Sequence, residues 1–138
     1  MTRSFALEDG DLAVRSSRVQ LVSGQDKLKQ DLDCWLKETY GSDRFHLLYG
    51  SVLDQYVGSV INFDTAAYIR AEVIRVLNNF QQLQLRRVQA NAALFSPQQL
   101  LDTIVSVVVG SNYDTIVAVV TYQTATGTTG QLGLSVGV

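Results

Sequence analysis

The sequence is poor in the residues that build metal sites, disulfides and reactive thiols. Its 138 residues include one cysteine, Cys34, one histidine, His46, and one proline, Pro97. A single cysteine cannot form a disulfide within the chain, which indicates folding in a reducing compartment. A structural zinc site needs about four Cys or His ligands at short spacing. The sequence therefore predicts neither a metal nor any other cofactor.

An excess of basic charge and a long apolar run are also missing. The net charge of -2 and the pI near 5.2 argue against a nucleic-acid partner, because binding a phosphate backbone requires a basic face. The longest apolar run, around residues 104–109, is too short to cross a bilayer. The N-terminal MTRSFALEDG lacks the apolar segment of a secretory signal. We expect a soluble protein made inside the cell, with neither nucleic acid nor a membrane as partner.

The motifs of nucleophilic and phosphate-binding enzymes give no support for catalysis either. The pattern G-x-S-x-G occurs as GLSVG at residues 133–137, but it lies within a Gly- and Thr-rich segment and not at a predicted strand-to-helix turn, so it does not predict a nucleophile elbow. The sequence contains no glycine-rich phosphate loop. Cys34 lies beside Trp35 on a predicted helix, whereas a reactive cysteine needs accessible, electropositive surroundings. A glycosidase needs two carboxylates that flank a cleft, but those of this chain are scattered, and each serves equally well as a turn former, a helix cap or a solvated charge. The candidate carboxylates are Glu8, Asp9, Asp11, Glu38, Asp43, Asp54 and Asp64. The sequence predicts no enzyme.

The sequence does contain the pattern of two amphipathic helices. Apolar residues recur along one face of a first helix that begins after the cap Ser23; they are Leu28, Leu32, Trp35 and Leu36. A second, longer helix is predicted from Asp64 to about Arg86, with an apolar side made of Ile69, Val73, Val76, Leu77, Phe80 and Leu83. Glu72 and Arg75 fall on its outer face, where an ion pair contributes a few tenths of a kcal/mol, roughly.

Short alternating apolar segments flank the helices. SFAL, LAV and RVQLV predict two or three short strands near the N-terminus. LDTIVSVVVG and DTIVAVVTYQT are β-branched runs joined by GSNYD, which predicts a β-hairpin. Both faces of this hairpin are largely apolar, so we expect another chain to cover one of them. The predicted fold class is α+β: short N-terminal strands, two main helices and a C-terminal β-hairpin with an open edge.

Length and composition divide the chain into one domain and a tail. A chain of this size can bury a single core, and we expect one domain over residues 1–124. Residues 125–138, ATGTTGQLGLSVGV, are rich in Gly and Thr, with apolar residues at Leu132, Leu134, Val136 and Val138. This composition predicts a flexible, extended tail that becomes ordered only beside a partner.

A cluster of distinctive side chains follows the first predicted helix. Asp43, Arg44, Phe45 and Tyr49 lie close together in the sequence, and arginine with aromatic residues is the composition of interface anchors. Arg44 can bind a carboxylate through two hydrogen bonds or bind a row of carbonyl groups. Composition alone equally allows Phe45 to pack on the core while Arg44 is solvated.

The order of several segments resembles a known family. These segments are GQDKLKQDL, ETYGSDRF, LLYGSVLDQYVG, the long helix, and SPQQLLDTIVSVVV leading into a hairpin. Together they resemble the phage baseplate wedge proteins of contractile tails, also called tail-sheath initiators, some of which carry the label "lysozyme-like". The resemblance covers residues 5–123. Because its motifs are short, it depends on their order and spacing.

The resemblance implies a structural protein without catalysis in the baseplate of the virion tail, assembled in the host bacterial cytoplasm. Its partners would be other baseplate wedge proteins, the tail sheath protein, and tail tube or hub proteins. In the family, a Glu-Pro-Arg-like motif after the first long helix holds the helical core bundle of the wedge. The matching positions here are Ser42, Asp43 and Arg44. The arginine is retained, the proline is missing and the acid is shifted by one position.

The family's C-terminal hairpin offers a free edge to strands from sheath subunits. The matching positions are Thr103, Val105, Val107 and Val109 on one strand and Thr115, Val117, Val119 and Thr121 on the next. The residues agree with this role, because an exposed β-branched edge is an aggregation liability unless it serves as a template for strand addition. Two alternatives remain open: a peptidoglycan-degrading, lysozyme-like enzyme, and the same structural role in a type VI-like bacterial injection system.

Overall fold

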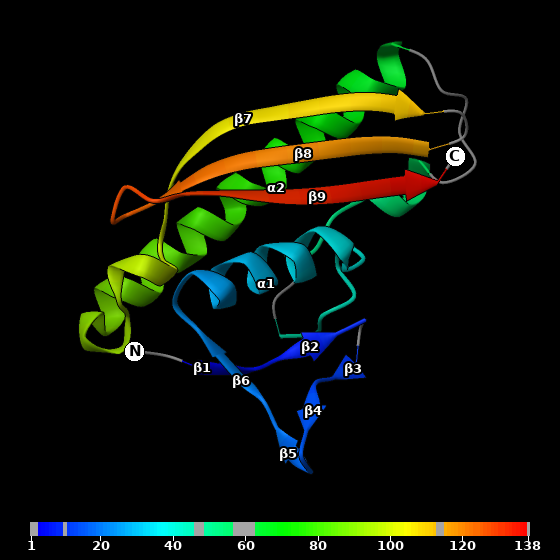
Figure 1. Cartoon of the computed structure of the whole chain (residues 1–138). Helices are drawn as coiled ribbons and strands as arrows, with labels where there is room; N and C mark the ends of the chain where they lie inside the picture. The colour runs from blue at the N-terminus through cyan, green and yellow to red at the C-terminus, as the bar shows by residue number, and fades with distance from the viewer. Residues whose placement is uncertain (1–2, 10, 46–48, 57–62, 113–114, 138) are drawn as a thin grey trace.

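The protein is built on one antiparallel sheet with two long helices packed on the same face (Figure 1). The computed structural model describes residues 3–9, 11–45, 49–56, 63–112 and 115–137. The helices are α1 (Gly24–Lys37) and α2 (Phe63–Ala90), and the sheet has the order β7 (Leu101–Asn112), β8 (Thr115–Thr124), β9 (Thr129–Gly137). Three short 3-10 turns connect these elements: η1 (Leu53–Tyr56), η2 (Ala92–Leu94) and η3 (Pro97–Gln99). The predicted α+β class is confirmed.

Strand β9 is the main difference between the predicted and the observed fold. A flexible tail and a two-stranded hairpin were expected, but β9 pairs with β8 from Thr115↔Gly137 to Gln123↔Thr129. Leu132 and Leu134 are buried on the helix side, with 4% and 6% of their surface exposed. The prediction of a tail without a partner in its own chain is therefore wrong, because alternating leucines bury against the helices while the backbone completes the ladder.

The two helices meet the sheet around Trp35. Its ring packs edge-to-face against Phe80 of α2, with centroids 5.3 Å apart, which is a favourable arrangement of aromatic quadrupoles. The core is formed by the apolar stripes predicted for both helices and by one face of the sheet. Its sheet residues are Val107, Ile116, Ala118, Val120, Tyr122, Leu132 and Leu134. Each fully buried Val, Leu or Ile among them contributes roughly 1.5–3 kcal/mol.

A partly buried ion pair within α2 is hydrogen-bonded to the segment that follows α1. Glu72 is only 8% exposed and accepts hydrogen bonds from Nε of Arg75 at 2.8 Å and from the backbone N–H of Val52 at 2.9 Å. The guanidinium of Arg75 lies 5.0 Å from the centroid of the Tyr40 ring, a cation–π contact. The expectation of an exposed surface pair is wrong, because residues near Val52 fold over this part of α2.

The N-terminal segment forms three two-stranded ribbons that share one centre. The pairs are β1 (Arg3–Phe5) with β6 (Leu21–Ser23), β2 (Leu7–Glu8) with β3 (Asp11–Leu12), and β4 (Val14–Arg15) with β5 (Arg18–Val19). A ring of backbone hydrogen bonds closes the centre: Ala6 N–H donates to Gln20 O, Gln20 N–H to Ala13 O, and Ala13 N–H to Ala6 O. Two or three strands were predicted here, and the described residues form six. Each strand has only two or three residues, which is too short to show an alternating pattern in the sequence.

One side chain of α1 ties these ribbons to the body of the protein. Gln30 donates through Nε2 to the carbonyl of Phe5 at 2.9 Å and accepts from the N–H of Leu7 at 3.0 Å. Six large apolar residues of the ribbons remain exposed: Phe5, Leu7, Leu12, Val14, Val19 and Leu21. The ribbons are therefore held by hydrogen bonds more than by a core of their own.

The Glu72 pair predicts a pH-dependent contribution to stability. Burial alone would raise the pKa of Glu72, but the hydrogen bonds from Arg75 and Val52 outweigh it, so the pKa lies below its ordinary value. A lowered folded-state pKa stabilises the protein above the unfolded value near 4.3 and loses this effect as pH falls through the folded value. Chemical unfolding at pH 7 should show Glu72→Gln less stable by about 1–2 kcal/mol.

The difference between wild type and Glu72→Gln should shrink as the pH is lowered from about 5 to 3, because the wild-type carboxylate then becomes protonated. A difference that is the same at pH 3 and pH 7 would contradict this account of the pair.

Candidate functional site

After α1, a backbone bridge holds Thr39 and Ser51 side by side, so the chain between them forms a closed loop. Thr39 and Ser51 form a parallel bridge, in which Ser51 N–H donates to Glu38 O at 2.8 Å and Tyr40 N–H donates to Ser51 O at 2.9 Å. The buried Ser51 hydroxyl donates to the carbonyl of Leu36 at 2.6 Å. This bond satisfies one of the carbonyls left open at the end of a helix. We call residues 39–51, whose ends this bridge joins, the docking loop, after the role that the sequence predicts for it.

Gly50 makes the closure of the docking loop possible. Its φ of +99° lies in the region that favours glycine, and an added Cβ would lie 2.7 Å from Glu38 O and 2.8 Å from Thr39 O. Gly41, at the other end of the loop, also has a positive φ, of +78°, but has open space where a Cβ would stand. The backbone at Gly50 is therefore constrained both by conformation and by close approach.

The docking loop presents Arg44 and Phe45 to solvent. Asp43 Oδ1 accepts the N–H of Phe45 at 2.8 Å, an Asx turn that shapes the tip. The hydroxyl of Ser42 bonds to Thr39 O at 2.7 Å. Phe45 is 90% exposed, and Arg44 is exposed beside it. This arrangement decides between the two predicted environments: Phe45 does not pack on the core, and a nearly bare aromatic next to an arginine is typical of an interface anchor.

Tyr49 lies apart from this tip. Its ring packs edge-to-face on Trp35, with centroids 4.7 Å apart. Burial, with smaller contributions from nearby negative charges, raises the pKa of Tyr49 to about 12. The position of Tyr49 argues against its predicted docking role, because the side chain supports the loop from the core side. His46 lies outside the described residues.

The second predicted interface was an open edge on the β-hairpin, and the third strand, β9, occupies one side of that hairpin. Thr115, Val117, Val119 and Thr121 lie on β8, whose two neighbours are β7 and β9. A central strand has no free edge, so these residues cannot accept another strand while β9 is in place. Their side chains line the face of the sheet that points away from the helices, since the alternate residues of β8 are buried. The open edge expected on this strand is absent.

The outer edge of β7 carries the other predicted residues and is partly covered by α2. Arg70 Nε donates to Val107 O at 3.1 Å, and Gln81 Nε2 donates to Asp102 O at 2.6 Å. Gln84 accepts the N–H of Leu101. Thr103, Val105, Val107 and Val109 were expected to share one face of the strand. A shift in register between Ile104 and Ser106 breaks this alternation. Val107 is therefore buried, whereas Val105 is exposed. Side chains thus blunt this edge, as edge strands commonly require.

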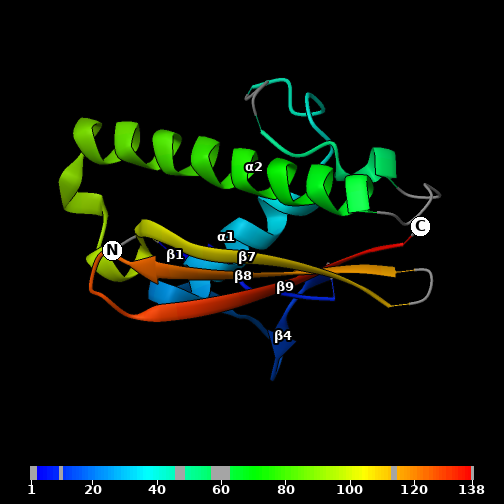
Figure 2. The ribbon, with the colours of Figure 1, turned by 90° about the horizontal axis from the view of Figure 1, so that it is seen from above.

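The outer edge of β9 is open. The N–H of Thr124 donates to Thr128 O at 2.9 Å, and bonded and non-bonded pairs alternate along an antiparallel ladder. Thr124 and Thr128 are therefore a bonded pair, and every second pair along the β8–β9 register is bonded like it. Gln131, Gly133 and Ser135 belong to the non-bonded pairs between them, so their backbone N–H and C=O groups point away from β8. These three residues have no hydrogen-bond partner on that side among the described parts of the chain. Figure 2 shows β9 as one border of the sheet.

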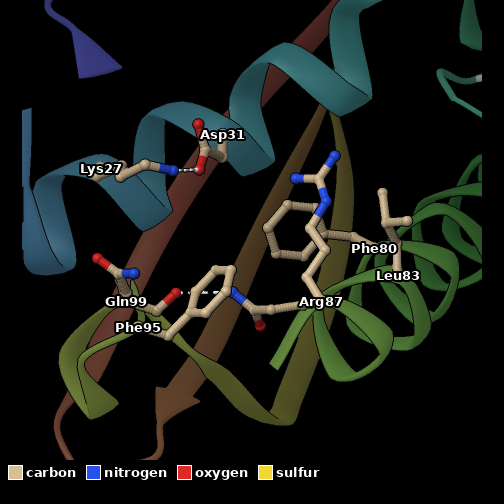
Figure 3. Close-up of a pocket in the computed structure, with 8 residues that line it drawn as sticks. Lys27, Asp31, Phe80, Leu83, Arg87, Phe95 and Gln99 are labelled. Carbon is tan, nitrogen blue, oxygen red and sulfur yellow. Dashed lines mark hydrogen bonds and ion pairs between the residues drawn. The ribbon is translucent and has the colours of Figure 1, made fainter. Parts of the chain in front are cut away.

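A water-sized cavity and a large groove are candidate places for a substrate. The cavity holds about 30 Å³ between α1, α2 and η3 (Figure 3), which is room for about one water molecule. Lys27 is paired there with Asp31, and Gln84 donates to the carbonyl of Gln99 at 2.7 Å. The groove, of about 750 Å³, lies between α1, β9 and the N-terminal ribbons. The groove, unlike the cavity, is large enough to receive part of another molecule.

Within the described ranges, no group of three or more His, Cys, Asp or Glu residues is arranged to hold a metal ion. Neither described helix combines the length and the apolar character that crossing a membrane requires.

Comparison with known proteins identifies a shared fold. No protein-family model and no curated protein sequence matches the chain. Its structure is similar to a crystal structure from Geobacter sulfurreducens of a protein named "putative tail lysozyme", with a TM-score of 0.61 and 17% sequence identity. The match covers 86% of this chain and 95% of the other. At this level of identity the likeness establishes the fold.

The two glycines of the docking loop allow a matched test, because both have a positive φ but only Gly50 lacks space for a Cβ. Gly50→Ala should lower the free energy of unfolding by about 2–4 kcal/mol, because it adds left-handed strain and a clash with two carbonyls. Gly41→Ala should lower it by only about 1–2 kcal/mol, the conformational cost alone. Denaturant unfolding of both variants measures the difference. Equal losses would mean that the loop base relaxes and is not held as described.

Proposed function

We propose that the protein is a structural component of a contractile phage tail: a baseplate wedge protein that links the wedge core to the first sheath ring. The open edge of β9 carries this proposal, because an unpaired backbone ladder is a template for a strand of another chain. The order of the sequence motifs and the fold shared with a protein named as a tail lysozyme support the same setting. The partners proposed are other wedge proteins and the tail sheath protein.

The two surfaces have separate roles in this proposal. The docking loop, with Arg44 and Phe45 at its tip, binds the wedge core: Phe45 enters an apolar pocket while Arg44 bonds to carboxylates or carbonyl groups. The edge of β9 accepts a strand from the sheath, so that the first ring copies the register of this sheet. The sequence predicted the accepting edge on the β7–β8 hairpin, whereas this proposal assigns it to β9.

The docking loop can be tested without disturbing the fold. Arg44→Ala and Phe45→Ala should each weaken binding to the assembled wedge proteins at least tenfold, because anchors of this kind carry much of an interface's free energy. Both side chains are exposed, so the melting temperature should stay within about 2 °C of wild type. Pull-down titration and thermal unfolding of the same samples measure the two effects. A large fall in melting temperature would instead assign these residues to the fold.

The strand edge can be tested by one proline. Gln131→Pro removes an N–H that points away from β8 and leaves the β8–β9 bonds intact, which edge strands tolerate. It should abolish sheath assembly on the baseplate while the purified protein stays folded, and Gln131→Ala, which keeps the N–H, should assemble normally. Val117→Pro cannot serve this purpose, because it would break the central strand. Normal sheaths on the Gln131→Pro protein would rule out strand addition here.

The lysozyme-like alternative has a specific observation behind it. Asp9, Asp26, Asp33 and Glu38 all line the large groove, and a glycosidase needs a pair of carboxylates around a cleft. Turnover of purified peptidoglycan that is lost in Asp26→Asn or Glu38→Gln would favour the enzyme. The structural proposal expects no turnover by the wild-type protein.

A further inference from the structure

The large groove runs beside the open edge of β9. Leu132 and Gly133 of β9 form one wall, and Leu7 and Asp9 of the N-terminal ribbons form part of another. The floor is the outer face of α1, where residues at helical spacing project into the groove; these are Asp26, Lys29, Gln30, Asp33 and Lys37. A strand added to β9 would therefore place alternate side chains over α1.

The groove is negatively charged. Its lining includes four carboxylates, Asp9, Asp26, Asp33 and Glu38, against two lysines, Lys29 and Lys37, which leaves a net charge of -2. The Nζ of Lys37 is 2.9 Å from Asp33 Oδ2, so this lysine is already engaged. Asp26 is exposed in the first turn of α1.

The half-buried thiol of Cys34 lines the same groove. Burial raises the pKa of Cys34, and the charges of Asp33 and Asp31 raise it further. The carboxylates thus act on groups inside the groove as well as on its rim.

Resting on the proposed function, we infer that the strand that adds to β9 carries lysine or arginine at the alternate positions that face α1. Its backbone pairs with Gln131, Gly133 and Ser135, which sets its register. Its basic side chains lie in the groove near Asp26 and Glu38, and its other side chains continue the exposed face of the sheet. Main-chain bonds provide affinity for any extended segment, whereas the charge of the groove selects among segments.

Two synthetic peptides of equal length separate these effects. One alternates Thr and Lys and the other alternates Thr and Glu, with both ends blocked, so their backbones offer the same hydrogen bonds. The Lys peptide should bind at least tenfold more tightly at low salt, and its advantage should fall as salt is added. By NMR, it should also slow the hydrogen exchange of the amides of Gln131, Gly133 and Ser135. Isothermal titration measures the affinities.

Two charge-neutralising variants locate the selectivity. Asp26→Asn should reduce the preference for the Lys peptide several-fold. Asp64→Asn should leave it unchanged, because Asp64 is also an exposed acid in a first helical turn, that of α2, and does not line the groove.

The outcomes distinguish this inference from the proposed function. Equal binding of the two peptides, or binding without protection of the three amides, overturns the inference about basic strands. If sheath assembly is nevertheless lost in Gln131→Pro, strand addition at β9 stands with a partner of different charge. If Gln131→Pro assembles normally, the proposed function fails whatever the peptides do.

Discussion

The pairing of β9 with β8 is the interaction on which the rest of the structure depends. It makes β8 a central strand, buries Leu132 and Leu134 over the helices, and moves the open edge of the sheet to β9. Because hydrogen bonding alternates along the ladder, the same pairing decides that Gln131, Gly133 and Ser135 present their backbone groups outward. The position of the open edge is therefore a consequence of how the chain completes its own sheet.

The docking loop depends on a second set of constraints, which act through α1 and α2. Ser51 is bonded to Leu36, the backbone of Val52 is bonded to Glu72, and Tyr49 packs on Trp35. These contacts hold the base of the loop on the core and leave its tip, Arg44 and Phe45, in solvent. A loop base held by these contacts would limit the conformational entropy lost if the tip bound a partner.

Much of this architecture follows from periodicity in the sequence. Both helices and the β7–β8 hairpin were predictable, because apolar residues recur at helical spacing or in β-branched runs long enough to identify the element. Composition marked Arg44 and Phe45 as anchor candidates, but it did not decide whether Phe45 is exposed or packs on the core. Tyr49 was assigned to the same surface because neighbouring aromatics in a sequence do not reveal which one packs inward.

Strand β9 and the burial of Glu72 were harder to predict from the sequence. Strand β9 is rich in Gly and Thr, which is typical of flexible tails, and the alternation of Leu132 and Leu134 was its only mark of burial. The burial of Glu72 could not be predicted, because its partner across the fold is the backbone N–H of Val52, and a backbone group has no sequence signature.

A density map of the assembled tail tests the central claim most directly. The account predicts a fourth strand, from another chain, hydrogen-bonded to β9 through Gln131, Gly133 and Ser135. A map in which solvent or a helix lies against that edge, with no added strand, would contradict it.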